Sequence, residues 1–186
     1  MVWDPLLRIF HWLLVACFLI AYLLEDQMLH LHLLAGSVVL GLLIFRLIWG
    51  VAGTKHARFS DFICSFRQLF AHLYALLHMR SSRHLGHTPT GGIMIFFLLA
   101  GLLMLTFSGV LLYSLESSSL PFSSLMAAAD LDTILFIEAL HAWVADILAL
   151  SVFLHIAGVL VESILQKQNL IGAMVSGYKT VEKEDL

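Results

Sequence analysis

The sequence predicts an all-α integral membrane protein, built as a four-transmembrane-helix bundle with an amphipathic helix on its cytoplasmic surface. Composition is the first observation: 60% of the 186 residues are hydrophobic and only 12% are charged, and the mean hydropathy is +0.94. Four separate stretches are long and apolar enough to cross a bilayer. Because lipid offers no hydrogen-bond partners to an exposed backbone, each stretch must be helical, and residues 1–186 are expected to form a single membrane domain.

The four spans are expected at about Leu6–Leu24, His30–Gly50, Gly91–Tyr113 and Ile134–Leu165. The first is followed by Glu25, Asp26 and Gln27 and not by a small-residue cleavage site, which favours a retained span over a signal peptide. If the segment were a signal peptide instead, its cleavage would remove His11.

Charged residues outside the spans are divided between the two sides of the membrane. All basic residues fall on the side shared by the N-terminus, the second connection (residues 51–89) and the C-terminus: Arg8, Arg46, Lys55, Arg58, Arg67, Arg80, Arg83, Lys167, Lys179 and Lys183. The positive-inside rule makes this side cytoplasmic. The opposite side, with the connection 114–133, carries only acidic residues: Glu25, Asp26, Glu116, Asp130, Asp132 and Glu138. This acidic outer face either attracts a basic partner or only aids solubility.

The cytoplasmic connection contains an amphipathic pattern between Asp61 and His78. Its apolar residues recur at helical spacing: Phe62, Phe66, Leu69, Phe70, Leu73, Leu76 and Leu77. This pattern predicts a helix on the membrane surface with Arg67 and Arg80 toward lipid headgroups, and its arginine and histidine content disfavours a fifth span. The polar end of the chain, Val181–Leu186, is expected to fray.

Besides His30, the first residue of the second span, four histidines lie within the predicted spans. His141 and His155 are fourteen residues apart on the last span, so helix geometry places them within ~40° of one another and ~21 Å apart along the axis. His11 is expected at the depth of His155 and His32 at the depth of His141. A lone histidine in a membrane helix can simply hydrogen-bond to a neighbouring helix, but two pairs matched in depth disfavour that interpretation. The remaining histidines are expected to face solvent or headgroups: His30, His56, His72, His78, His84 and His87.

Two histidines that face each other across a bundle interior fit a b-type haem with two imidazole ligands. Zinc is the alternative metal, but it generally asks for four ligands, and the sequence clusters no carboxylate or thiolate at either depth. The cysteines Cys17 and Cys64 form no C-x-x-C-H motif, so neither a disulfide nor a covalently attached haem is expected. Two haems stacked ~20 Å apart by the helix rise would form an electron path across the membrane.

Three further features each allow two interpretations. Arg46, fourteen residues after His32, either pairs with a haem propionate or a quinone oxygen, or extends to lipid headgroups. Asp146 must be neutral, paired or near water, and either relays protons or orients a ligand. The glycines inside the spans provide either close helix packing or clearance for a flat cofactor: Gly36, Gly41, Gly101, Gly109 and Gly158.

Several short motifs occur together along the chain. They are Val2–Trp12, His32–Gly36, Phe45–Gly50, His56–Phe62, Gly86–Gly92, the pair His141 and His155, Asn169–Leu170 and Ser176–Lys179. In combination they resemble the bacterial cytochrome b561 family, which includes the b-type cytochrome subunits of nickel–iron hydrogenases and stand-alone relatives. The resemblance covers nearly the whole chain.

The resemblance implies a four-helix protein that holds two haems b and exchanges electrons between membrane quinone and a redox partner. The axial ligands that it implies are His11, His32, His141 and His155. With the depth matching above, His11 and His155 are expected at the inner iron, and His32 and His141 at the outer iron.

Three residues qualify this resemblance. His32 is favoured over His30 because the family pattern has a glycine four positions after the histidine, and Gly36 supplies it. Ala142 stands where the family often has glutamate, which leaves a ligand-orienting or proton-handling role at that position unsupported. His87, in a Gly-His-Thr-Pro turn, matches a family motif and is a candidate for lining a quinone or haem site.

The expected function is that of an electron-transfer subunit in the bacterial inner membrane, with both termini in the cytoplasm. Quinol or quinone would react at one haem, and a c-type cytochrome or hydrogenase-like enzyme would engage the other at the acidic outer face. A self-contained superoxide:quinone oxidoreductase is the alternative, which the lack of outer basic residues disfavours. A haem-free scaffold or transporter is the third hypothesis. The chain has no nucleotide motif and no large soluble domain, and no nucleic acid is expected among its partners.

Overall fold

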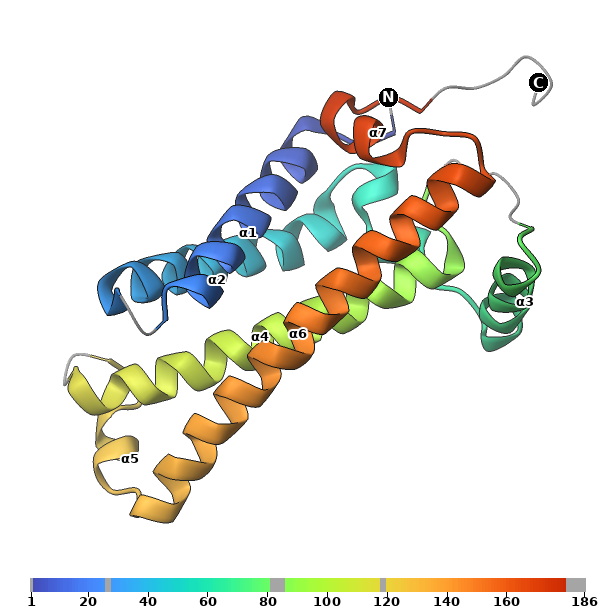
Figure 1. The fold of residues 1–186 in the computed structure, drawn as a ribbon. Helices are drawn as coiled ribbons and strands as arrows, with labels where there is room; N and C mark the ends of the chain where they lie inside the picture. Colours follow the sequence, from blue (N-terminus) through green and yellow to red (C-terminus); the bar gives the residue numbers. More distant parts are fainter. Residues whose placement is uncertain (1, 26–27, 81–85, 118–119, 180–186) are drawn as a thin grey trace. The chain divides into compact units, whose positions relative to one another are not determined.

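The computed structural model describes residues 2–25, 28–80, 86–117 and 120–179. Every regular element within these ranges is helical. Four long helices account for most of the chain: α1 (Pro5–Leu23), α2 (Leu29–Ala52), α4 (Pro89–Glu116) and α6 (Leu131–Leu165) (Figure 1). Each is long and apolar enough to cross a membrane. The predicted all-α, multi-pass membrane architecture is confirmed.

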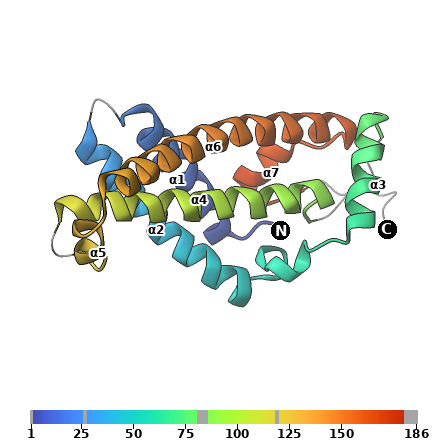
Figure 2. The same ribbon diagram turned by 90° about the horizontal axis from the view of Figure 1, so that it is seen from below.

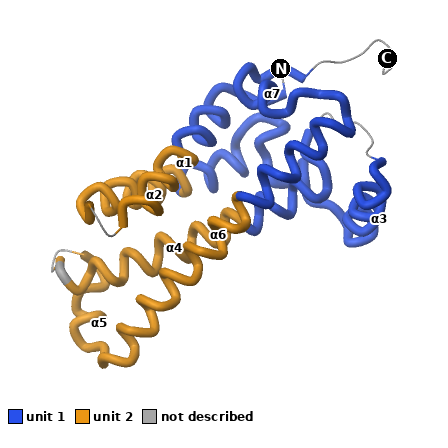
Figure 3. The backbone as a smooth tube through the Cα atoms, in the orientation of Figure 1, with its two compact units in different colours: residues 1–13, 44–97, 153–186 blue, residues 14–43, 98–152 orange. Residues whose placement is uncertain are grey.

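The chain divides into two compact units (Figure 3). Unit 1 comprises residues 1–13, 44–97 and 153–186, and unit 2 comprises residues 14–43 and 98–152. Each of the four long helices contributes residues to both units. The division coincides with the charge pattern, because all ten lysines and arginines of the sequence belong to unit 1 and none belongs to unit 2.

One face of α6 is buried and the opposite face is exposed. His141, Leu148, His155 and Glu162 recur every seven residues along the helix, and Leu148 and Glu162 among them are buried. The other face presents large apolar side chains: Phe136, Trp143, Leu150 and Ile164. A seven-residue spacing keeps side chains on one side of a helix, so both histidines share a stripe that points away from the lipid-facing surface.

The surface helix predicted between Asp61 and His78 is α3 (Phe66–Leu77). It begins with a capping box, in which the Gln68 backbone N–H donates to Ser65 Oγ and the Ser65 backbone N–H donates to Gln68 Oε1. Its exposed apolar residues form one stripe: Phe66, Phe70, Leu73, Tyr74 and Leu77. Figure 2 shows α3 lying across the ends of α4 and α6 that belong to unit 1. This arrangement suits a helix that rests with its apolar stripe in a membrane surface.

Short helices complete the described chain: η1 (Lys55–Ala57), η2 (Phe59–Asp61), α5 (Ser123–Ala127) and α7 (Leu170–Ser176). Two long helices extend three residues beyond their predicted ends, since α4 continues to Glu116 and α6 begins at Leu131. The earlier start of α6 has a local cause, because Asp130 Oδ1 accepts the backbone N–H of Thr133 at 2.9 Å. The predicted fraying of Val181–Leu186 concerns a segment outside the described residues.

Asp4 fixes the start of α1 and joins it to the end of α2. One carboxylate oxygen accepts the Leu7 backbone N–H at 2.9 Å, with Pro5 at the first helical position. The other accepts from Thr54 Oγ1 at 2.7 Å and from Trp49 Nε1 at 3.3 Å. Burial raises the pKa of the Asp4 carboxyl, but these hydrogen bonds outweigh burial and hold it below the ordinary value of 3.8.

We expect Asp4→Ala to lower the stability of the detergent-solubilised protein by about 1–2 kcal/mol at neutral pH, because the substitution removes a helix cap. A depressed folded-state pKa contributes stability that is present above the unfolded pKa and lost as pH falls through the folded value. The stability difference between wild type and variant should therefore begin to shrink as the pH falls to 3.8 and continue to shrink through the lower folded-state pKa. A stability gap that stays constant into acid would contradict this role, and Thr54→Val is the control that removes one hydrogen bond only.

Gly177 connects the end of α7 to the first residues of the chain. Its φ is +85°, a left-handed conformation that ends α7 and favours glycine. Its carbonyl accepts the backbone N–H groups of Val2 at 2.8 Å and Trp3 at 3.3 Å, and a Cβ here would lie 2.8 Å from the Trp3 carbonyl oxygen. Two sequence motifs far apart in the chain, at Val2 and at Ser176, are thus parts of one contact.

Candidate functional site

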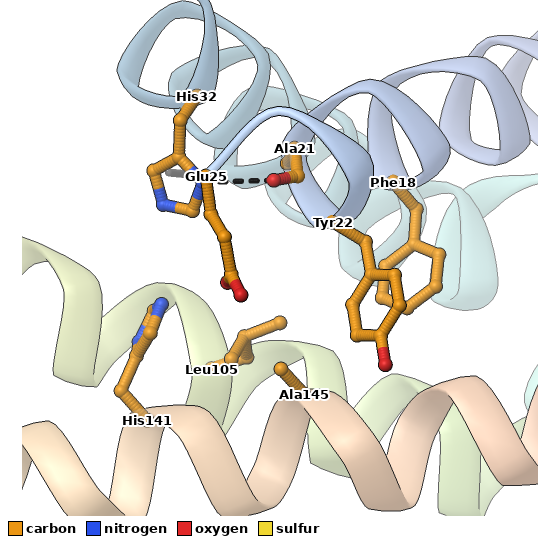
Figure 4. A pocket seen from close by; sticks show the side chains of 8 residues that line it. All are labelled: Phe18, Ala21, Tyr22, Glu25, His32, Leu105, His141 and Ala145. Carbon is orange, nitrogen blue, oxygen red and sulfur yellow. Dashed lines mark hydrogen bonds between the residues drawn. The ribbon is translucent and has the colours of Figure 1, made fainter. Parts of the chain in front are cut away.

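The first candidate site is the pair of histidines in unit 2. The imidazole rings of His32 on α2 and His141 on α6 lie with their centroids 6.1 Å apart. They approach a common pocket from opposite sides (Figure 4). The pocket is lined by Phe18, Ala21, Tyr22, Glu25, His32, Leu105, His141 and Ala145. The structure therefore brings together the two histidines that depth matching paired.

In each of these two histidines, a hydrogen bond at Nδ1 orients the imidazole ring. His32 Nδ1 lies 2.9 Å from the Ala21 carbonyl oxygen, which can only accept, so this nitrogen carries the proton. His141 Nδ1 lies 2.9 Å from Ser108 Oγ. Ser108 Oγ also lies 3.0 Å from the Leu105 carbonyl, which can only accept; with its hydrogen donated there, the hydroxyl accepts from His141 Nδ1–H. Both Nε2 atoms are then unprotonated and available as metal ligands, each oriented through its other nitrogen.

The spacing of the two rings fits a metal ion held between them. Two collinear metal–imidazole bonds of ~2.0 Å each, plus the half-widths of two rings, separate the ring centres by ~6 Å, and the observed separation is 6.1 Å. Within the described ranges, no three His, Cys, Asp or Glu side chains converge on one point. A pair of opposed imidazoles matches the axial ligands of a haem better than the four ligands of zinc.

The glycines inside the spans differ in their surroundings, and the sequence allows them either close helix packing or clearance for a flat cofactor. Gly101 and Gly109 serve close packing, because a Cβ at Gly101 would lie 2.7 Å from Leu148 and one at Gly109 would lie 3.1 Å from His141 Cε1. Gly36, Gly41 and Gly158 have open space instead, since a Cβ at any of these positions would have no heavy atom within 4 Å. Gly36 is one turn after His32 and Gly158 is three residues after His155, so each pair of histidines has clearance for a flat group beside it.

The second pair, His11 on α1 and His155 on α6, belongs to unit 1. Both imidazoles are half-buried, and they are close enough to interact electrostatically. His11 Nδ1 is buried and has no hydrogen-bond partner. An unsatisfied buried imidazole nitrogen is costly, and a metal ligand bond would satisfy it once the ring turns that nitrogen toward the iron. The donor set of this pair fits a second haem.

Arg46 lies in unit 1 and is buried, with 3% of its surface exposed. Its Nη1 donates to the Ala57 carbonyl at 3.0 Å, and its guanidinium stacks 4.6 Å from the centre of the Phe59 ring. The interpretation that Arg46 extends to lipid headgroups is therefore wrong. No ion pair to Arg46 occurs in the part of the chain that the structure describes, so its other N–H groups are free to bind an incoming carboxylate.

His87 sits between two aromatic rings of unit 1, 4.5 Å from Trp3 and 4.6 Å from Phe62. Burial lowers its pKa to about 3, with help from the positive charges of Arg46 and Lys179. The imidazole is therefore neutral at physiological pH. Its Nδ1 is buried without a partner, which leaves it able to hydrogen-bond a polar ligand.

Asp146 on α6 is paired within unit 2. The Tyr22 hydroxyl donates to its Oδ1 at 3.0 Å. A carboxylate in a membrane helix is expected to be neutral, paired or near water, and Asp146 is paired with a hydroxyl group. Tyr22 and Ser108 are site residues that the sequence did not single out.

The remaining histidines differ in their surroundings. His30 and His78 are exposed, as expected, and His56 Nδ1 lies 2.8 Å from Asp61 Oδ2. The expectation is wrong for His72, which is only 7% exposed, because the side of α3 that carries it packs against Thr90. It is also wrong for His87, whose imidazole is enclosed by Trp3 and Phe62 with its Nδ1 buried. His84 lies outside the described residues.

Known proteins support the haem interpretation. The chain matches the family model described as prokaryotic cytochrome b561 over residues 2–177. It is 24% identical over 161 residues to a protein of Cupriavidus necator named probable Ni/Fe-hydrogenase B-type cytochrome subunit, and the match covers 80% of this chain but 66% of that relative's length. No solved structure matches the chain significantly. Because the family match extends over nearly the whole sequence and includes all four span histidines, the chain belongs to the prokaryotic cytochrome b561 family.

Proposed function

We propose that this protein is a di-haem electron-transfer subunit that connects the quinone pool of the bacterial cytoplasmic membrane to a redox partner. The observation that carries the proposal is the pair His32 and His141, whose rings are 6.1 Å apart and whose Nδ1 atoms are both held by hydrogen bonds. Family membership implies b-type haem. A haem with two imidazole ligands carries one electron at a time and has no open position for oxygen.

Each group of residues has a distinct role in this proposal. His11 and His155 hold the inner haem, and His32 and His141 hold the outer haem. The helix α6 carries one ligand of each site, fourteen residues apart, and the helix rise separates these two residues by ~21 Å along its axis.

The polar groups of unit 1 supply contacts around the inner haem. Arg46 offers its unused N–H groups to a propionate or to a quinone oxygen, since it is charged and already fixed by Ala57 and Phe59. His87 offers a neutral imidazole to the same kind of ligand. Both side chains are held before any ligand arrives, which lowers the entropy cost of binding.

Charge sets the proposed orientation and the proposed partner. Unit 1 carries all ten basic residues, which supports placing its loops and both termini in the cytoplasm. The acidic connections of unit 2 would then face outward and attract the partner, a c-type cytochrome or a hydrogenase-like enzyme. The name of the Cupriavidus necator relative supports a hydrogenase-like partner. Superoxide:quinone reduction is disfavoured, since unit 2 has no lysine or arginine to steer an anion.

Quinol oxidation by the purified protein tests this function. The protein is reconstituted in liposomes that contain quinol, and the b-type absorbance is followed after mixing with a water-soluble one-electron acceptor. We expect quinol to reduce the haem and the acceptor to reoxidise it. Haem that dithionite reduces but quinol does not would contradict a role in the quinone pool.

Ser108 should tune the outer site without being a ligand. We expect Ser108→Ala to weaken haem retention there by about 10–100-fold, because His141 Nδ1 loses the acceptor that orients its ring. The rate of haem transfer to apomyoglobin measures this effect. Ser114→Ala is a matched control: Ser108 and Ser114 are each 2% exposed and lie on α4, but Ser114 Oγ donates only to its own helix, at Val110. Equal rates for the two variants would contradict the role of Ser108.

A further inference from the structure

Glu162 is a buried carboxylate near the C-terminal end of α6. It is 9% exposed, and its Oε1 accepts from the Thr88 hydroxyl at 2.9 Å and from the Thr90 hydroxyl at 3.1 Å. Its Oε2 accepts from Gln166 Nε2 at 3.3 Å. Glu162 follows His155 by seven residues, so it lies on nearly the same face of α6, ~10.5 Å along the axis.

The hydrogen bonds continue from Glu162 to the surface helix. Thr90 Oγ1 lies 3.2 Å from His72 Nδ1 on α3. Thr90 Oγ1 also lies 3.3 Å from Thr88 Oγ1. When the Thr90 hydroxyl donates its hydrogen to Glu162, its oxygen accepts from His72 Nδ1–H. In this arrangement the donors follow one order: His72 Nδ1–H to the Thr90 hydroxyl, and the Thr90 hydroxyl to the Glu162 carboxylate. All of its members belong to unit 1.

Among the residues that the structure describes, few charged or titratable groups surround Glu162. His72 faces it from α3 through Thr90, and Lys179 acts on it electrostatically from the segment after α7. The other side chains that contact its carboxylate are uncharged: Thr88, Thr90 and Gln166. Joining α3 and α4 to α6 does not require an ionisable group, and burying one is costly. An acid, a hydroxyl and an imidazole in sequence are the components of a proton relay.

We propose that His72, Thr90 and Glu162 carry protons between the aqueous side of α3 and a quinone that reacts near His155. This inference rests on the proposed function, because it needs a quinone that exchanges electrons with the inner site. Reduction of a quinone to a quinol takes two electrons and two protons. The electrons are those that the proposed function delivers.

Each proton moves through the relay in the same way. The Glu162 carboxylic acid loses its O–H proton to a quinone oxygen, where a new O–H bond forms. The resulting carboxylate takes the hydroxyl proton of Thr90, Thr90 takes the Nδ1 proton of His72, and His72 takes a proton from water at Nε2. Because Nε2 is buried in the structure, this last step needs a motion of α3 that exposes it, and a flip of the imidazole ring then returns the new proton to the side of Thr90. The cycle runs twice for each quinone, and quinol oxidation runs it in reverse.

Glu162→Gln tests the relay, because the amide oxygen still accepts hydrogen bonds from both threonines but the side chain cannot carry a proton. We expect normal haem content and normal reduction by dithionite. Quinol oxidation in liposomes should fall on the order of 100-fold, the scale of a lost acid–base group. Proton release, followed with a pH-sensitive dye, should slow in parallel, and Glu162→Asp should restore part of both rates.

Two further comparisons separate a relay from a structural contact. Thr90→Val interrupts the chain. Thr88→Val removes the other hydroxyl on the same carboxylate oxygen, together with its contacts to Thr90 Oγ1 and the Gly91 backbone N–H, but leaves His72, Thr90 and Glu162 in place. We expect slow proton release only in Thr90→Val. We also expect added imidazole to restore proton release in His72→Ala, which a structural role for His72 does not predict.

The outcomes distinguish this inference from the proposed function. If wild-type protein does not react with quinol, the proposed function fails and the relay fails with it. If wild type reacts but Glu162→Gln and Thr90→Val match it in rate and in proton release, only the relay is overturned. If Glu162→Gln loses haem, the comparison of Thr90→Val with Thr88→Val decides the question, and equal effects of these two variants overturn the relay.

Discussion

His141→Ala is expected to halve the haem content of the purified protein, with the remaining haem unchanged in its spectrum. His32→Ala should give the same product, because the two imidazoles face each other 6.1 Å apart and a haem between them loses one axial ligand in either variant. His11→Ala and His155→Ala should remove the other haem. Haem per chain, measured as pyridine haemochrome, and the redox-difference spectrum identify which component is lost.

His30→Ala is the control for these ligand variants. His30 is exposed and lies two residues before His32, so its replacement should leave both haems in place. Loss of the same component from His141→Ala and His11→Ala, or from His155→Ala and His32→Ala, would show that the histidines pair differently.

Gly36→Phe is expected to abolish binding of the outer haem although every ligand remains. The position is one turn after His32, on nearly the same face of α2, and no heavy atom lies within 4 Å of a Cβ placed there. If that space belongs to the macrocycle, a phenyl group will occupy it and exclude the haem. The measured result should match that of His32→Ala in haem content and in the component lost.

Gly41→Phe offers a matched control for this substitution. Gly41 also has no neighbour within 4 Å of its Cβ position, and nine residues after His32 it lies on the opposite face of α2. The protein's own atoms leave room for a side chain at both glycines. A difference in haem content between the two variants would therefore come from a cofactor bound beside Gly36. Equal haem content in Gly36→Phe and Gly41→Phe would mean that the space beside His32 is not a haem site.

The long helices could be predicted because their signal is local. Runs of apolar residues long enough to span a bilayer leave one possible secondary structure, and errors were confined to helix ends. Asp130 caps α6 four residues before the predicted start of that span, and capping depends on which side chain reaches a backbone N–H. Hydropathy alone does not report that contact.

The site residues divide according to whether helix geometry alone could find them. The alignment of His141 with His155 follows from helical spacing, and the same seven-residue step from His155 to Glu162 could have identified the buried carboxylate. Ser108 could not be found in this way, because its role depends on how α4 packs against α6.

The burial of His72 could not be predicted, because amphipathic spacing does not say which polar residue of a surface helix faces the protein. The structure shows that His72 packs inward against Thr90. The sequence pattern predicted the presence of α3 correctly, but the partner of its buried histidine lies on another helix, α4.

The central claim is that each unit holds one haem b between two histidines, and the haem count of the purified wild-type protein tests it most directly. Potentiometric titration of the b-type α-band, combined with pyridine haemochrome and protein determination, gives the number of haems per chain. The account predicts two b-type components for each polypeptide. A single component, or a dithionite-reduced minus oxidised spectrum without a b-type α-band, would contradict it.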